Sequence, residues 1–149
     1  MNRILQKLAN RLKNVFSPPG AEKRTERQKK GAFGEEIAAE YLERKGFHVR
    51  YRNYRVGKDE IDLIAEDKVR YIFCEVKTRV QQYGVPSFYG RPGRAVDKEK
   101  QRNLIHASAS FSVRHQRDGK RFRFDVIEVY LNKDGSVGHV HHIENAFTR

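Results

Sequence analysis

Two runs of strand-forming residues lie close together in the segment 59–79, which reads DEIDLIAEDKVRYIFCEVKTR. β-Branched and aromatic side chains favour strands, and the short polar interval between the runs predicts a β-hairpin. Four charged residues are nevertheless set into these runs: Glu60, Asp62, Glu75 and Lys77. Any fold that buries this hairpin must therefore give a pairing partner or a role to charges inside a sheet.

The alternation of side chains across a strand predicts how these charges face one another. If the hairpin closes about Lys68 and Val69, residue 64 pairs with 73 and Asp62 lies opposite Glu75, with Cβ atoms about 5 Å apart. The other face would then carry only apolar residues, which are Ile61, Leu63, Ile72, Cys74 and Val76.

Two facing carboxylates repel each other, and a bound cation relieves that repulsion. Oxygen ligands suit Mg²⁺, or Mn²⁺, better than Zn²⁺. We therefore identify Asp62 and Glu75 as candidate metal ligands, and Lys77, on the same face as Glu75, as a stabiliser of charge developing on a phosphate. The alternative is a hairpin with one solvated face, on which Glu75 and Lys77 are ordinary surface charges.

The length and cysteine content restrict the class of protein. A chain of 149 residues can bury a core as one domain without disulfides, and Cys74 is its only cysteine. No apolar run reaches the roughly 20 residues of a membrane span, and the start of the chain lacks the apolar core of a signal peptide. We expect a cytoplasmic protein without structural zinc.

Positive charge is concentrated in two blocks. Residues 1–30 hold 9 Lys and Arg against 2 Asp and Glu, and residues 91–123 hold 10 against 3. Residues 31–90, which contain the hairpin, hold 10 of each kind, and the whole chain carries +12. A basic chain without membrane segments most often binds a polyanion, and nucleic acid is the expected partner.

The first 30 residues differ from the rest. Residues 3–16 place apolar side chains at helical spacing among cations, which predicts a basic amphipathic helix, and residues 17–30 read as a flexible linker. That helix either docks on a partner or surface or forms a frayed basic tail. The ordered domain is expected over 31–149.

The remaining elements follow from periodicity and turn signals. Helices are expected over 32–46 and 95–114, and strands over 47–56, in the hairpin, and over 121–131 and 135–144. Gly46 is placed to stop the first helix. The order α-β-β-β-α-β-β predicts an α/β fold with a mixed β-sheet flanked by helices.

Basic and aromatic residues around the second helix are candidate nucleic-acid contacts. As a cluster they predict phosphate binding, although a solvated helix face is the alternative for each residue. These residues are Arg91, Arg94, Lys98, Lys100 and Arg102. Tyr83, Phe88 and Tyr89, in the preceding loop, could stack on unpaired bases or cover the core. His139 and His141 share one face of the last strand, as metal ligands or as surface residues.

Several segments together resemble one family. GAFGEEIAAEYLERKGFHVRYRNYR, EIDLIAED, FCEVKTR, AVDKEKQRNL and RFDVIEV are similar to the bacterial YraN-like family over residues 31–149. That family in turn resembles the archaeal Holliday-junction resolvases and the PD-(D/E)XK nuclease superfamily. The resemblance implies a restriction-endonuclease-like fold and a homodimer.

The resemblance also implies site residues. The superfamily motif falls on Asp62, Glu75 and Lys77, and the resolvases' helix carboxylate falls on Glu35, whose alternative role is to complement the helix dipole. Ile61 stands where the superfamily often has proline, and Asp59 stands where related chains usually have glycine.

Three functions remain open on the sequence. The first is a Mg²⁺-dependent nuclease that hydrolyses DNA phosphodiester bonds, at branched or flapped structures. The second is a nucleic-acid-binding protein that keeps the nuclease fold without turnover, and the third is a scaffold recruited through the N-terminal helix. Facing carboxylates favour the first, because a binding protein does not need them.

Overall fold

A computed structural model describes residues 24–81, 96–115 and 119–148. The predicted helix over 3–16, most of the linker, the loop aromatics, Arg91 and Arg94 lie outside these residues. The elements follow in the order α2 (Glu26–Arg44), β1 (His48–Val56), β2 (Asp59–Glu66), β3 (Arg70–Val80), α3 (Lys98–Arg114), β4 (Arg121–Leu131) and β5 (Val137–Phe147). The predicted order α-β-β-β-α-β-β is confirmed.

The five strands form one mixed sheet in the order β1-β2-β3-β4-β5. β3 and β4 are parallel, and every other neighbouring pair is antiparallel. The parallel pair requires a crossover, and α3 lies within that connection. β5 is an edge strand.

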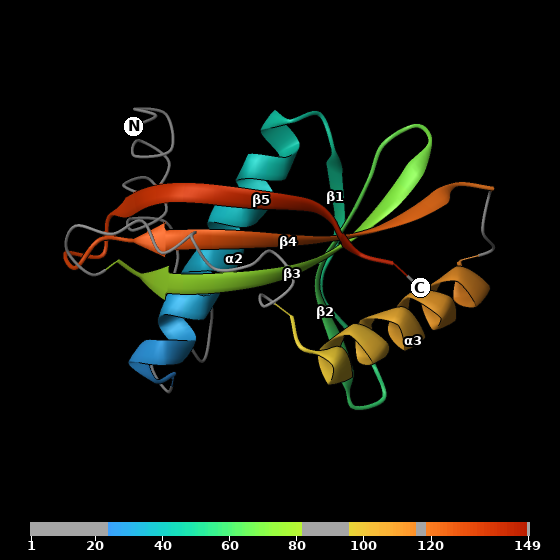
Figure 1. The fold of residues 1–149 in the computed structure, drawn as a ribbon, viewed down its shortest axis with the longest axis horizontal. Coiled ribbons are helices and arrows are strands. Elements are labelled where there is room, and N and C mark those ends of the chain that lie inside the picture. The colour runs from blue at the N-terminus through green and yellow to red at the C-terminus, as the bar shows by residue number, and fades with distance from the viewer. Residues whose placement is uncertain (1–23, 82–95, 116–118, 149) are drawn as a thin grey trace.

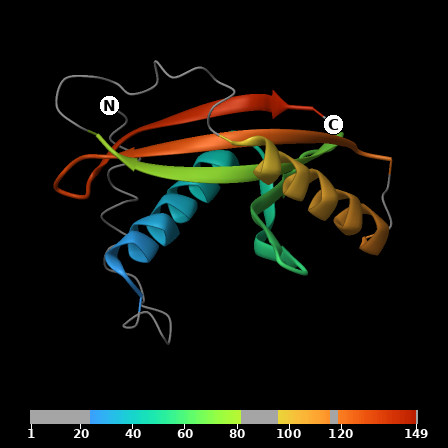
Figure 2. The ribbon, with the colours of Figure 1, turned by 60° about the horizontal axis from the view of Figure 1, so that its bottom comes forward.

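The two helices cover opposite faces of the sheet. Ile37 and Leu42 of α2 pack with Ile72 and Cys74 of β3, whereas Leu104 and Phe111 of α3 pack in a separate cluster. That second cluster contains Phe73, the residue of β3 that lies between the other two and points the other way. Figure 1 shows α2 crossing behind β3, β4 and β5, and in Figure 2 it lies below them.

The helix α2 begins within the segment that the sequence predicted as a linker. Oγ1 of Thr25 accepts a hydrogen bond from Gln28 N, and Oε1 of Gln28 accepts one from Thr25 N. This capping box satisfies backbone donors that a helix start otherwise leaves open, so the helix begins at Glu26. At the other end Gly46 adopts a φ of +92° and stops the helix as predicted.

Asp125 is a fully buried acid on β4, and its role is structural. Its carboxylate accepts two hydrogen bonds of 2.8 Å from Arg123, and Nε2 of His142 lies 2.7 Å away. Asp125 therefore holds Arg123 as a buried ion-pair partner. Among the described residues, neither helix is long and apolar enough to cross a membrane.

Candidate functional site

The register between β2 and β3 brings the predicted carboxylates together. Ile64 pairs with Phe73 and Leu63 with Cys74, which is the register predicted for the hairpin. The pairing ends there, one step before Asp62 and Glu75. In place of the next pair, Val76 N donates a 2.8 Å hydrogen bond to Oδ2 of Asp62. The Asp62 side chain thus lies against β3 where the two strands cease to pair.

One prediction about the hairpin faces is wrong. Ile61 packs with Ile64 and Phe73 on the α3 side and not with Leu63 on the α2 side, so strict alternation fails across Asp62. On β1, Asn53 falls between the residues paired with 61 and 63 and has a φ of +49°. A left-handed residue at this point in the neighbouring strand breaks the regular pleat that the prediction assumed.

The charge of Asp62 is unfavourable in this position. Burial and the neighbouring charge of Glu75 raise the pKa of the Asp62 carboxyl to about 8, although the hydrogen bond from Val76 acts in the opposite direction. Glu75 itself is buried, with 5 % of its surface exposed. Two buried carboxylates this close require either a shared proton or a cation. The site is therefore suited to bind positive charge.

Two lysines contact Glu75. Nζ of Lys77 lies 3.2 Å from its Oε1, and Nζ of Lys100 lies 3.2 Å from its Oε2 and 3.4 Å from the Glu60 carbonyl oxygen. Asp97 caps the start of α3 by accepting a 2.8 Å hydrogen bond from Lys100 N. Lys100, predicted from the sequence as a phosphate contact, thus joins the carboxylates from α3.

The residues present fit a divalent cation. Oε2 of Glu75 is buried and accepts no hydrogen bond within the described chain, because Lys100 approaches it without hydrogen-bonding geometry. Lys100 contacts this oxygen as an ion-pair partner at 3.2 Å, so a cation would take the position by displacing the ammonium group. Within the described residues, however, no three His, Cys, Asp or Glu side chains group closely enough to hold a metal by themselves. A cation here would take Asp62 and Glu75 as protein ligands and complete its shell with water or phosphate.

Glu35 approaches the same carboxylates from α2. Burial raises the pKa of the Glu35 carboxyl, a hydrogen bond with Asn53 lowers it, and neighbouring acids that include Glu75 raise it further. The adjacent Glu36 instead forms an ion pair with Arg52. The structure therefore brings Glu35, and not Glu36, into the electrostatic range of Asp62 and Glu75.

A close helix–strand contact fixes the position of Glu35. A Cβ built on Gly34 would lie 1.8 Å from Oγ1 of Thr78, so only glycine lets α2 approach β3 this closely. The next residue in the helix is Glu35, and its height over β3 is set by that contact. The Gly-Glu pair in the sequence was the signal for this arrangement.

Two other predicted cations, Lys98 and Arg102, form no ion pair with the carboxylates of the described chain. Both side chains are exposed on α3. Glu60, which shares a strand with Asp62, pairs with Arg55 at 2.9 Å and not with Lys77. Lys98 and Arg102 are thus available to a ligand, whereas Lys77 and Lys100 are already engaged with Glu75.

Sequence reasoning missed a polar row beside the site. In the sheet Lys77 pairs with Glu128, and Glu128 with His141. Glu128 accepts 2.9 Å hydrogen bonds from Arg79 and from the Tyr130 hydroxyl, and lies 3.4 Å from Nδ1 of His141. His139 and His141 therefore share a strand face as predicted, and His141 contacts Glu128, an acid that the sequence analysis did not single out.

Fold and site together define a mixed α/β protein with a buried carboxylate pair flanked by lysines. The chain belongs to the uncharacterised protein family UPF0102, whose model matches residues 34–129. This confirms the family resemblance that the sequence motifs indicated.

Relatives match over most of their length. A UPF0102 protein of Clostridium botulinum (strain 657 / Type Ba4) is 42% identical over 118 residues, which are 78% of this chain and 92% of the relative. A UPF0102 protein of Caldanaerobacter subterraneus subsp. tengcongensis is 37% identical over 126 residues, which are 84% of this chain and 99% of the relative.

One solved structure with limited similarity is that of Pyrococcus furiosus SfsA in complex with Ca²⁺. It is 18% identical, with a TM-score of 0.31, and the match covers 78% of this chain and 63% of SfsA, less than two thirds of that protein. A similarity at this level carries no argument about this chain.

Proposed function

We propose that this protein is a metal-dependent nuclease that hydrolyses phosphodiester bonds in DNA, at branched or flapped structures. The observation that carries the proposal is the buried pair Asp62 and Glu75, in which Oε2 of Glu75 accepts no hydrogen bond within the described chain. A site for a divalent cation needs such a pair of oxygen ligands, and the ion pairs of Glu75 with Lys77 and Lys100 offset its charge when no metal is bound.

Each residue of the candidate site would have its own role. Asp62 and Glu75 would hold Mg²⁺ or Mn²⁺, which when bound supplies a water of lowered pKa and neutralises charge on a phosphate. Lys77, with its Nζ already 3.2 Å from Glu75, is placed to stabilise negative charge that develops on the phosphate. Glu35, with a pKa above its usual range, would accept a proton from an attacking water.

One observation favours a second candidate, a nucleic-acid-binding protein that keeps the fold without turnover. Lys77 and Lys100 both contact Glu75, so the site has compensating charge even without a metal. In this case the lysines would be permanent partners of the carboxylate. The first candidate requires at least Lys100 to leave Glu75 when a cation arrives.

The decisive experiment is a metal titration of cleavage. Wild type and Asp62→Ala are incubated with labelled linear, flapped and four-way DNA in increasing Mg²⁺ or Mn²⁺, and Glu99→Gln serves as an exposed-carboxylate control. We expect metal-dependent cutting of at least one substrate by wild type and by the control, but not by Asp62→Ala. If wild type cuts nothing in either metal, the binding protein becomes the better candidate.

A further inference from the structure

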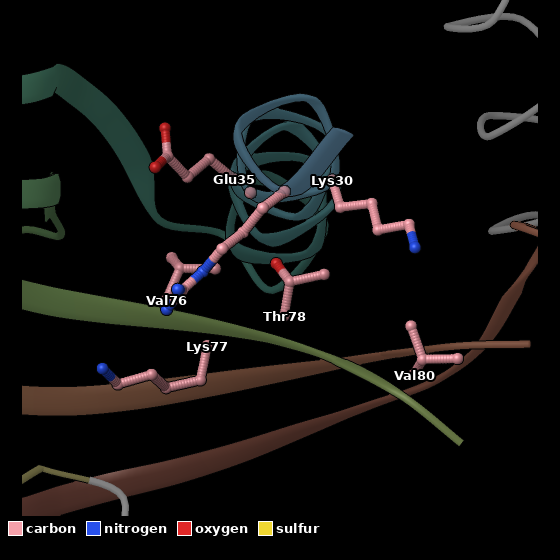
Figure 3. Close-up of a pocket in the computed structure, with 8 residues that line it drawn as sticks. Lys30, Glu35, Val76, Lys77, Thr78 and Val80 are labelled. Atoms are coloured by element: carbon pink, nitrogen blue, oxygen red, sulfur yellow. The ribbon is translucent and has the colours of Figure 1, made fainter. Parts of the chain in front are cut away.

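A groove leads away from the candidate site between the start of α2 and the end of β3. A cavity of about 390 Å³ lies there, and among its lining are Arg27, Lys30, Glu35 and Lys77. In Figure 3 Lys30 and Glu35 extend from the helix, and Val76, Thr78 and Val80 line the strand beneath it. The cavity is thus lined in part by Glu35 and Lys77, which belong to the candidate site.

A second cavity continues the first. It measures about 200 Å³ and shares Lys30 and Val80 with the larger one. Its floor is apolar, formed by Phe33, Val80 and Leu131, and Lys29 and Lys30 stand at its rim. The groove therefore passes from a polar, cationic part to an apolar pocket with a cationic edge.

The charge of the groove identifies the class of ligand. Of the described residues that line the two cavities, five are Lys or Arg and Glu35 alone is acidic. Arg27 and Lys30 are exposed and have no ion-pair partner within the described chain. Lys29 and Lys77 are paired with Glu26 and Glu75, whereas the charges of Arg27 and Lys30 are not neutralised by the described chain, and these two favour an anionic polymer. Residues 3–16 of this chain carry four cations and no acid, so they are a poor match for the groove.

We infer that this groove binds an unpaired nucleic-acid strand. Its phosphates contact Arg27 and Lys30, and one base enters the apolar pocket against Phe33 and Val80. A base reaches such a pocket only when it is unstacked from a partner strand, so the ligand is single-stranded. The inference rests on the proposed function in taking nucleic acid as the ligand, and it adds the strand state and the path.

The test measures binding without metal or turnover. Fluorescence anisotropy with a labelled single-stranded thymidine oligonucleotide is recorded in EDTA, using the full chain. Val80 is 44% exposed where the two cavities meet, and Val113, on α3, is 83% exposed. We expect Val80→Glu to weaken binding at least about tenfold, because it places a carboxylate where a base and a phosphate lie. Val113→Glu, with the same change of net charge, should stay within about twofold of wild type.

Two further arms keep the inference testable if Val80→Glu does not fold. An abasic oligonucleotide of equal length should bind wild type about tenfold more weakly, since the pocket loses its base. Arg27→Gln should flatten the dependence of log affinity on log salt by about 0.7, the value for one phosphate of a single strand. Arg44→Gln, an exposed arginine at the other end of α2, should leave that slope unchanged.

The outcomes separate this inference from the proposed hydrolysis. Equal affinities for Val80→Glu and Val113→Glu, or for normal and abasic strands, would contradict strand binding in the groove even if the protein cuts DNA. Binding with the expected pattern by a protein that cuts nothing would leave the groove in place and reject the hydrolysis alone.

Discussion

The backbone N–H of Val76 donates a 2.8 Å hydrogen bond to the Asp62 carboxylate, one residue beyond Leu63 and two beyond Cys74, the last paired residues of β2 and β3. This contact fixes one oxygen of Asp62, whose carboxyl also feels the charge of Glu75. Because the contact needs only an acceptor, asparagine can replace aspartate at this position and keep the local geometry. Substitutions here can therefore test charge separately from structure.

Divalent affinity should depend on both carboxylates. We expect the double variant Asp62→Asn/Glu75→Gln to bind Mn²⁺ at least about tenfold more weakly than wild type, because both oxygen ligands lose their charge. Isothermal calorimetry measures this directly, with Glu99→Gln as the control. Equal heats and affinities in wild type and the double variant would remove the metal from this site.

Substitution of the two lysines that contact Glu75 should have different effects on hydrolysis and on metal binding. Lys77→Ala should slow hydrolysis by a factor on the order of 10², as the loss of an electrostatic stabiliser does. Lys100→Met should instead raise divalent affinity, because a cation that competes for Oε2 of Glu75 is gone. The exposed Lys98→Met is the matched control for the second change. Unaltered Mn²⁺ affinity in Lys100→Met would contradict the competition between lysine and metal.

Asp62 should destabilise the metal-free fold as pH rises. Its pKa is raised in the folded state to about 8, so the folded state binds its proton more tightly and stability falls between about pH 4 and pH 8. Without metal, Asp62→Asn should melt higher than wild type at pH 8, by at least about 4 °C, and the difference should vanish near pH 4. Melting curves in EDTA across this range check it, and a difference independent of pH would count against the raised pKa.

Asp125 should stabilise the fold with a pH dependence opposite to that of Asp62. Burial raises its pKa, but hydrogen bonds from His142 and Arg123 outweigh that effect and hold the pKa below the usual range. Its contribution is thus present above about pH 4 and lost as pH falls below that value. Asp125→Asn should lower the free energy of unfolding by about 3 kcal/mol at pH 6, as breaking a buried ion pair does.

Urea denaturation of both proteins at pH 6 and pH 3 measures this contribution. The difference between them should narrow at pH 3, because the carboxyl of the unfolded chain, with a pKa of about 3.9, is then largely protonated. A constant difference at both values would mean that Asp125 acts through packing alone.

Much of the fold followed from local patterns. The hairpin register, the stop at Gly46 and the order of elements are short-range properties of the sequence. The early start of α2 also had a local signal, because Thr25 and Gln28 have the spacing of a capping box. The side of the sheet to which Ile61 points had no local signal, since it depends on the backbone of Asn53 in a neighbouring strand.

In the candidate site too, some contacts could be predicted from the local sequence and others depend on how distant elements pack. Asp62, Glu75 and Lys77 lie within one hairpin, so its register was enough to bring them close, even though alternation fails across Asp62. The contact between Lys100 and Glu75 joins residues that only the packing of α3 brings close. The cations of the groove, Arg27 and Lys30, were missed because a polar run read as a linker in fact forms the first turns of a helix.

The candidate site is drawn from one continuous stretch of chain, and this bears on the order of folding. Glu35, Asp62, Glu75 and Lys77 all precede the crossover that carries α3 to the parallel strand β4. Local antiparallel pairing forms faster than parallel pairing across a long connection. We expect the carboxylates to be assembled on the nascent chain while α3, and with it Lys100, is still being synthesised. For that interval the repulsion between the acids is compensated by Lys77 alone among the lysines that finally contact Glu75.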